Sequence, residues 1–141
     1  MKKTLENTTI ITVKFSEADS LSIVWHGHYI RYFEDGREAF GREYGLGYLD
    51  VFNNGFVTPI VTAHCDYKWP LRYGDSVKIV SEFVPSEAAK IRFNFTIYNA
   101  ETDQLVASGY TIQVFLDKND FMLQLSNPPF FEEWKQKHGM I

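Results

Sequence analysis

Several features are scarce in this chain of 141 residues, and each scarcity excludes a class of protein. Cys65 is the only cysteine, so the sequence carries neither a disulfide framework nor a cysteine-rich zinc site. No apolar run approaches the length of a membrane span. Lys and Arg number 14 against 18 Asp and Glu, which gives a formal net charge of -4. Clustered positive charge supplies most binding to nucleic acids, so we expect no nucleic-acid partner and no membrane partner.

The N-terminus also lacks a feature that would direct the chain out of the cell. It begins Met-Lys-Lys like a signal peptide, but no apolar segment follows and an acid comes early, at Glu6. We therefore expect a cytoplasmic protein in which Cys65 is a reduced, buried thiol.

Apolar and aromatic residues are plentiful. They make up 45% and 16% of the chain, so it can bury a core, and its length suits one domain. The rings exceed what an average small domain needs. The excess indicates an aromatic-lined interface or pocket.

The spacing of apolar residues changes along the chain and predicts both strands and helices. Residues 9–16 are β-branched and partly alternate, which is typical of a strand with one buried face. From residue 27 to residue 44 aromatic residues recur at helical spacing, and a pair of glycines then stops the helix. Gly36 and Gly41 each cost this helix about 1 kcal/mol relative to Ala, so we expect close backbone approach there. Four strands and a short helix complete the prediction, at residues 56–69, 76–85, 89–99, 104–117 and 128–138.

The connections between the predicted strands are short and polar or contain Gly or Pro. Short connections favour antiparallel neighbours, because a parallel crossover needs a dozen or more residues. One long helix against a five-stranded antiparallel sheet gives an α+β layer. Aromatic residues occupy both faces of the strands, so one helix would leave apolar surface exposed, and we expect at least a dimer.

Asp19 precedes the long helix by about eight residues, and this spacing suggests chemistry. The first backbone N–H groups of a helix lack intrahelical partners, and they suit a carbonyl oxygen that becomes an oxyanion. A carboxylate nearby can attack an activated carbonyl or take a proton from water. The arrangement therefore suits acyl transfer, although a simple turn at Asp19 and Ser20 would explain the same residues.

Other chemistries have weaker support. His26 and His28 are two residues apart and no third ligand stands at metal spacing, so we expect no metal site. There is no G-x-S-x-G motif and no phosphate loop. Cys65 and His64 would point to opposite faces of a strand, so a nucleophilic thiol is not expected. Basic residues that could meet the phosphates of a nucleotide-like carrier, or simply be solvated, are Lys68, Arg72, Lys90 and Arg92.

Two blocks of sequence carry the most specific signal. In "FSEADSLSIVWHGHYIRYFE", residues 15–34, the matching positions are Phe15, Asp19, Val24, His26 and Tyr29. In "DYKWPLRYGDSVKI", residues 66–79, they are Tyr67, Pro70, Leu71, Tyr73, Asp75 and Val77. Together the blocks resemble the hotdog-fold acyl-CoA thioesterases of the 4-hydroxybenzoyl-CoA thioesterase and YbgC type, and the resemblance extends over about residues 9–120.

The resemblance implies a hotdog domain, a long central helix wrapped by a five-stranded antiparallel sheet, over residues 1–141. It implies homodimers with a continuous sheet, often paired into homotetramers, with active sites between subunits. Asp19 would be the catalytic nucleophile or general base, and the His26 backbone N–H would polarise the thioester carbonyl. Gly27, Tyr29 and Phe33 would contact the substrate. No cofactor or metal is implied, because the thioester is already activated.

Two residues depart from the family pattern. Glu17 replaces its first Asp, and Ser22 replaces the usual Gly. If that glycine has a positive φ, Ser22 adds strain or bulk. A related hotdog branch places its catalytic acid on the helix, which would select Asp35. We prefer Asp19, because that branch usually lacks the upstream acids and the Y-x-x-P motif.

The sequence thus predicts an acyl-CoA thioesterase that releases a free acid and CoA. The nearest alternative is an acyl-carrier-protein thioesterase. Ser22 motivates a second alternative, a non-catalytic acyl-CoA binding protein. A hotdog hydratase acting on enoyl thioesters is a weaker third.

Overall fold

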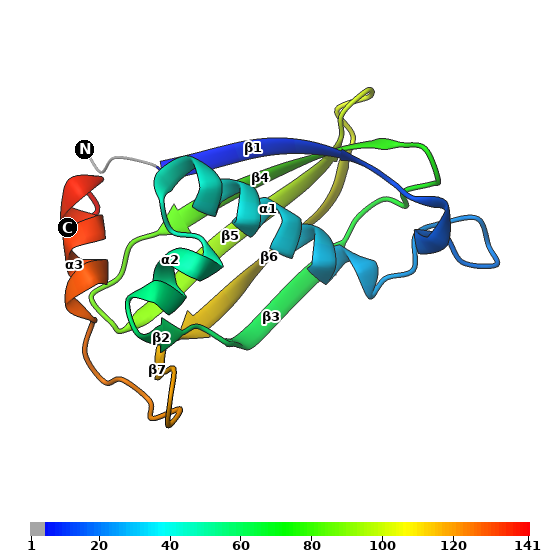
Figure 1. The fold of residues 1–141 in the computed structure, drawn as a ribbon. Helices are drawn as coiled ribbons and strands as arrows, with labels where there is room; N and C mark the ends of the chain where they lie inside the picture. Colours follow the sequence, from blue (N-terminus) through cyan, green and yellow to red (C-terminus); the bar gives the residue numbers. More distant parts are fainter. Residues whose placement is uncertain (1–4) are drawn as a thin grey trace.

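The computed structural model describes residues 5–141, in which an antiparallel sheet curves around one long helix (Figure 1). Residues 1–4 include the lysines on which the comparison with a signal peptide depended, so that prediction lies outside the described residues.

The strands are β1 (Leu5–Thr12), β2 (Phe56–Val57), β3 (Ile60–Tyr67), β4 (Ser76–Val84), β5 (Lys90–Asn99), β6 (Leu105–Val114) and β7 (Leu116–Asp117). The helices are α1 (His28–Tyr44), α2 (Tyr48–Asn53) and α3 (Pro129–Lys137), and a single 3₁₀ turn covers Phe15–Glu17.

The main sheet has the strand order β1-β4-β5-β6-β3, with every neighbouring pair antiparallel. In Figure 1, α1 runs across one face of this sheet, and α3 lies near the start of β1. β2 and β7 pair separately as a short two-stranded sheet. The predicted α+β hotdog architecture is confirmed.

Several predicted boundaries were wrong. The first strand ends at Thr12, before the 3₁₀ turn. The strand expected at 56–69 is divided into β2 and β3, and Pro59 at the break has no N–H to give to a ladder. The strand expected at 104–117 is divided into β6 and β7. The helix α2 was not predicted, although the Asp50 carboxylate caps its start by accepting the Gly47 N–H at 2.7 Å.

The expected close approach to the long helix is confirmed at Gly36. A Cβ atom there would lie 2.4 Å from Ser81 Oγ and 2.7 Å from Ile79 Cγ2, both on β4. The missing side chain therefore lets α1 rest directly on the sheet, which offsets the helical cost of glycine.

Stacked and edge-on aromatic rings fill the space between α1 and the sheet. Phe33 on α1 stacks on Phe95 of β5 with ring centroids 4.7 Å apart, and Phe40 meets Phe93 edge-on at 4.8 Å. Trp134 of α3 extends this cluster to Phe83, at 5.0 Å. Much of the aromatic excess is therefore core.

Among the described residues, no helix is both long enough and apolar enough to cross a membrane.

Candidate active site

Asp19 lies in a small hairpin within the loop that joins β1 to α1. Its N–H donates to the Ile23 carbonyl at 2.8 Å, and its own carbonyl accepts the Ser22 N–H at 3.0 Å. Closing this turn requires a φ of 68° at Ser22. The condition raised for this position, a positive φ, is met, and Ser22 therefore holds a conformation that favours glycine.

Only one of the two carboxylate oxygens of Asp19 is hydrogen-bonded within the turn. Oδ1 accepts the Leu21 N–H at 2.8 Å, whereas Oδ2 has no hydrogen-bond donor among residues 5–141. The simple turn expected at this position is therefore present. It also orients the carboxylate and leaves one oxygen free to act on a substrate or a water.

The start of α1 offers unused donors. Within the described part of the chain, no group accepts a hydrogen bond from the His26 or Gly27 N–H. The Tyr67 hydroxyl donates to the His26 carbonyl at 2.9 Å, which ties this peptide to the end of β3. The Trp25 ring covers Gly27, where a Cβ would lie 2.1 Å from it. The residues at the start of α1 are thus held in place, while the His26 and Gly27 N–H groups stay unpaired.

Asp19, His26 and Tyr29 line one cavity of about 320 Å³. The other lining residues come from the loop and from the segment after β3: Ile23, Val24, Tyr67, Lys68, Trp69 and Pro70. The residue with the free carboxylate oxygen, Asp19, and a residue with a free N–H, His26, therefore line the same space, whereas Gly27 does not line it. This arrangement can hold a carbonyl group and place an acid beside it.

Backbone hydrogen bonds bring the two sequence blocks together at this site. The Val24 N–H donates to the Leu71 carbonyl at 2.8 Å, and the Val13 N–H donates to the Asp75 carbonyl at 3.0 Å. The Gly74 N–H donates to the Val13 carbonyl at 3.1 Å. The second block therefore supports the Asp19 loop rather than supplying an acid.

Glu17 fastens the Asp19 loop to α1. The residue is 4% exposed, and its carboxylate accepts hydrogen bonds from the Lys14 N–H at 2.7 Å, from the Tyr32 hydroxyl at 3.1 Å and from the Arg31 guanidinium. Its carbonyl accepts the Trp25 N–H at 3.1 Å. Burial opposes its ionisation, but these donors outweigh burial and hold the pKa of Glu17 below its usual value. In the sequence, the only sign that Glu17 has a structural role was its position, two residues before Asp19.

The tyrosines and the thiol beside the site are neutral groups. Burial raises the pKa values of Tyr29, Tyr67 and Cys65. Because the raised pKa disfavours the thiolate, Cys65 is a poor nucleophile. Tyr67 was not predicted as a site residue, although its place in the Y-x-x-P motif was a signal that the residue has a fixed role.

The remaining predicted residues lie elsewhere. Phe33 is fully buried against Phe95. Asp35 lines a different cavity, on the β1 side of α1, and burial raises its pKa. Lys90 and Arg92 belong to the first part of β5, and Arg92 pairs with Val84. That end of the sheet is opposite the Asp19 loop (Figure 1), so one chain does not bring these cations to Asp19.

No cluster of three or more His, Cys, Asp or Glu side chains that could hold a metal ion occurs among the described residues. His26 and His28 each face the Trp25 ring, with centroids 4.9 Å and 5.5 Å away.

Comparison with known proteins agrees with the fold and identifies the family. Residues 13–135 match the model of the thioesterase-like superfamily. The chain belongs to that superfamily. The match spans both sequence blocks, so the recognised family is confirmed.

Two relatives and one solved structure illustrate what this superfamily member is similar to. YneP of Bacillus subtilis (strain 168), provisionally named an acyl-CoA thioesterase, is 29% identical over 111 residues, 79% of this chain and 80% of YneP. A 1,4-dihydroxy-2-naphthoyl-CoA hydrolase of Synechococcus sp. (strain CC9605) is 29% identical over 114 residues, covering 77% and 75%. The DHNA-CoA thioesterase structure from Staphylococcus aureus superposes with a TM-score of 0.84 at 22% identity, covering 94% and 89%, which shows the shared fold. These proteins are named as thioester hydrolases, the enzyme class predicted for this chain.

Proposed function

We propose that this member of the superfamily hydrolyses acyl-CoA thioesters, with Asp19 as nucleophile or general base. The observation that carries the proposal is the single cavity bordered by Asp19 and by the start of α1. The unpaired His26 N–H would donate to the thioester oxygen and stabilise the negative charge that develops there. Tyr67 would help to fix the conformation of His26 through its bond to the carbonyl of the following peptide, His26–Gly27.

Either role of Asp19 gives the same products. As a base, its carboxylate takes a proton from water while the water oxygen bonds to the carbonyl carbon, and the C–S bond then breaks to release the thiol and the acid. As a nucleophile, Oδ2 bonds to the carbonyl carbon and expels the thiolate. Water then cleaves the resulting anhydride, which releases the acid, restores the carboxylate and supplies the proton that the thiolate takes up. No cofactor is needed for either sequence.

The substrate contacts are part of the same proposal. Gly27 and Tyr29 would border the thioester, whereas Phe33 would support Tyr29 from within the core. Lys90 and Arg92 could meet CoA phosphates only across a subunit boundary, because one chain holds them far from Asp19. We propose a cytoplasmic homodimer or homotetramer in which residues 1–141 form one hotdog domain.

Two other functions use the same cavity. An acyl-carrier-protein thioesterase would act on the same thioester and differ only in the carrier. A non-catalytic acyl-CoA binding protein is favoured by the hydrogen bond that already engages Asp19 Oδ1 within its turn. Hydrolysis rates on matched acyl-CoA and acyl-carrier substrates separate these alternatives.

The test is thiol release by wild type and by Asp19→Asn across short, medium, long and aromatic acyl-CoAs. The nearly isosteric change keeps the Leu21 contact but removes the charge, so turnover should fall by about a hundredfold or more while the protein stays folded. Asp103→Asn is the matched control, because the Asp103 side chain is 80% exposed and lies in a hairpin.

Three outcomes are informative. Loss of turnover in Asp19→Asn but not in Asp103→Asn supports the proposed mechanism. Wild-type turnover in Asp19→Asn removes Asp19 from the mechanism. Saturable binding of acyl-CoA without thiol release from any substrate would favour the binding protein.

A further inference from the structure

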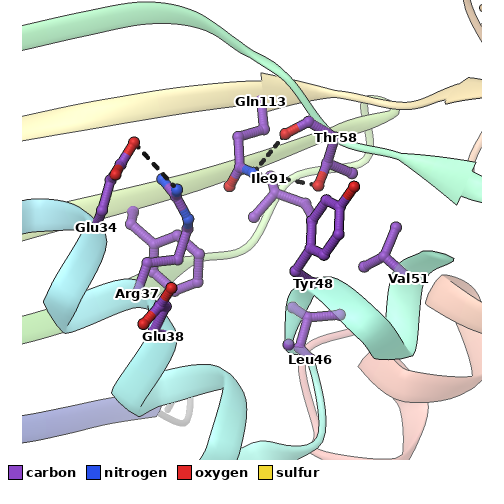
Figure 2. Close-up of a pocket in the computed structure, with 11 residues that line it drawn as sticks. Glu34, Arg37, Glu38, Leu46, Tyr48, Val51, Thr58, Ile91 and Gln113 are labelled. Carbon is purple, nitrogen blue, oxygen red and sulfur yellow. Dashed lines mark hydrogen bonds and ion pairs between the residues drawn. The ribbon is translucent and has the colours of Figure 1, made fainter. Parts of the chain in front are cut away.

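A second cavity lies farther along α1, between α1, α2 and the strands β5 and β6 (Figure 2). Its volume is about 200 Å³. Apolar groups make part of the wall, among them Leu46, Val51, Ile91 and Phe93. Arg37 extends into this cavity from α1 and Gln113 from β6, so polar groups from two elements meet there (Figure 2).

Gln113 presents a carbonyl oxygen without a partner. Its side chain is almost fully buried, with 5% of the residue exposed. Its Nε2 donates to the Thr58 carbonyl at 2.7 Å and to Thr58 Oγ1 at 3.2 Å. A carbonyl can only accept, so the amide cannot be turned around. Oε1 therefore faces away from Thr58, and it has no hydrogen-bond donor within residues 5–141.

Arg37 presents an unused donor in the same cavity. Its Nη1 is buried and has no acceptor among the described residues, while Nη2 lies 3.9 Å from a Glu34 oxygen. Burial lowers the pKa of Arg37, against the influence of Glu34 and Glu38. An unsatisfied buried donor and an unsatisfied buried acceptor each cost free energy, and a structure that keeps both is expected to satisfy them in another state.

A hydroxyl group matches these two atoms in kind, because it accepts one hydrogen bond and donates another. A carboxylate fits less well, since it cannot donate to Gln113 Oε1 and since Glu34 and Glu38 also line the cavity. An unsubstituted alkyl end would leave both polar atoms unpaired. We propose that this cavity binds a hydroxyl group carried by the acyl part of the thioester substrate.

The helix sets the distance between this hydroxyl and the thioester. Glu34 and Arg37 follow the first residue of α1 by six and nine positions, which is roughly 9 to 13 Å along the axis at about 1.5 Å per residue. An extended chain advances about 1.2 Å per bond. The acyl group therefore has about eight to eleven bonds between the carbonyl and the hydroxyl. This inference rests on the proposed function, because it takes the start of α1 as the place of the thioester.

The inner face of β3 carries small side chains in the part of the strand between the two cavities. Tyr67 contacts Tyr29 in the first cavity, with ring centroids 5.0 Å apart. The next residues on the same face of β3 are the half-buried Cys65 and the exposed Ala63, both small. Ile60 then pairs with Gln113, which lines the second cavity. Small side chains thus follow Tyr67 on this face of β3, in the direction of the residue that pairs with Gln113.

The test compares ω-hydroxydecanoyl-CoA with decanoyl-CoA. Wild type should favour the hydroxylated substrate by about tenfold in kcat/KM, the value of one well-placed hydrogen bond to a charged group. Arg37→Met keeps an unbranched apolar stem but removes the guanidinium donors, so this ratio should fall to near one, and Gln113→Met should lower it in the same direction. Arg42→Met is the matched control, because the Arg42 side chain is 72% exposed and lies outside the cavity.

A second measurement is independent of turnover. Wild type is titrated with ω-hydroxydecanoate and with decanoate, and the side-chain amide resonance of Gln113, assigned from Gln113→Met, is followed by NMR. Only the hydroxylated acid should shift it.

The outcomes distinguish this inference from the proposed function. A protein that hydrolyses both substrates equally, with no selective shift at Gln113, keeps the proposed function and overturns the hydroxyl site. A selective shift at Gln113 without thiol release supports the site and overturns the thioesterase. A sedimentation change in Arg37→Met with an unchanged substrate ratio would assign Arg37 to a subunit interface and overturn the inference.

Discussion

Ser22 carries backbone strain in the loop that holds Asp19. Its φ of 68° costs a residue with a side chain about 1 to 2 kcal/mol. Glycine avoids this cost, but it also gives the unfolded chain more conformational entropy, which cancels part of the gain in stability. We expect Ser22→Gly to raise the free energy of unfolding by about 0.5 to 1 kcal/mol, measured by urea denaturation. Ser22→Ala keeps the strain and is the control. Equal stability in all three proteins would show that the φ at this position costs nothing.

Glu17 is expected to matter for stability through its three hydrogen bonds. Glu17→Gln removes the charge that faces Arg31 and leaves the amide poorly matched to the Lys14 N–H and the Tyr32 hydroxyl. Arg31 is half exposed and can be solvated again, so we expect a loss of about 2 kcal/mol rather than the larger cost of a fully buried pair. Chemical denaturation at neutral pH measures this loss, with Glu133→Gln on the exposed surface of α3 as the control.

The same carboxylate predicts a direction of pH dependence. Because the folded pKa of Glu17 is lower than its usual 4.5, its contribution is complete above that value and is lost as the pH falls through the folded pKa. Wild type should therefore lose stability below about pH 4.5 more steeply than Glu17→Gln. Parallel stability curves for the two proteins between pH 5 and pH 3 would contradict this assignment.

The contact between α1 and the sheet depends on Gly36. Gly36→Ala places a methyl group against Ser81 Oγ and Ile79 Cγ2, and both belong to a packed strand. Overpacking of this kind costs up to about 3 kcal/mol, which exceeds the gain of about 1 kcal/mol in helix propensity. We expect Gly36→Ala to lower the melting temperature.

Ser81→Ala in the Gly36→Ala background provides the check. Removing Oγ relieves the nearer of the two contacts but leaves Ile79, so the double variant should recover part of the loss. A Gly36→Ala protein at least as stable as wild type would show that α1 can move away from β4 without cost.

At the scale of the whole molecule, the main sheet has two edge strands, β1 and β3, and they are protected differently. On β1, the Tyr44 hydroxyl of α1 already donates to the Glu6 carbonyl. On β3, no side chain of residues 5–141 bonds to the strand backbone, and six of its eight residues are exposed. An unprotected edge is a template for another strand, which favours β3 as the edge that pairs in the proposed dimer.

Matched charges on the two edges test this assignment. Val61 of β3 and Ile10 of β1 are 57% and 61% exposed. We expect Val61→Lys to weaken self-association about tenfold in sedimentation, because two lysines would meet across a symmetric interface. Ile10→Lys should leave it unchanged. Dissociation by Ile10→Lys alone would place the dimer on β1.

Local sequence determined more of the elements than of their boundaries. Alternation and helical spacing were enough to predict α1, the five strands of the main sheet and α3, because these patterns record which side of each element faces the core. Pairing between β2 and β7 and the capping of α2 depend on neighbours distant in the chain. The aromatic excess was interpreted as a pocket or interface, yet Phe33, Phe40, Phe93 and Phe95 are core.

The sequence by itself determined the family, the order of the elements and the two blocks around Asp19 and Tyr67, because each is a local pattern of residue types. Only the tertiary structure decided which groups share a cavity. It placed Asp19 beside the start of α1. It buried Glu17, whose hydrogen bonds hold the Asp19 loop against α1, and it placed Lys90 and Arg92 away from the site. It also left Arg37 and Gln113 with unpaired atoms in one space. Hydrogen-bond partners are fixed by the packing of distant strands and helices, and no spacing along the chain records them.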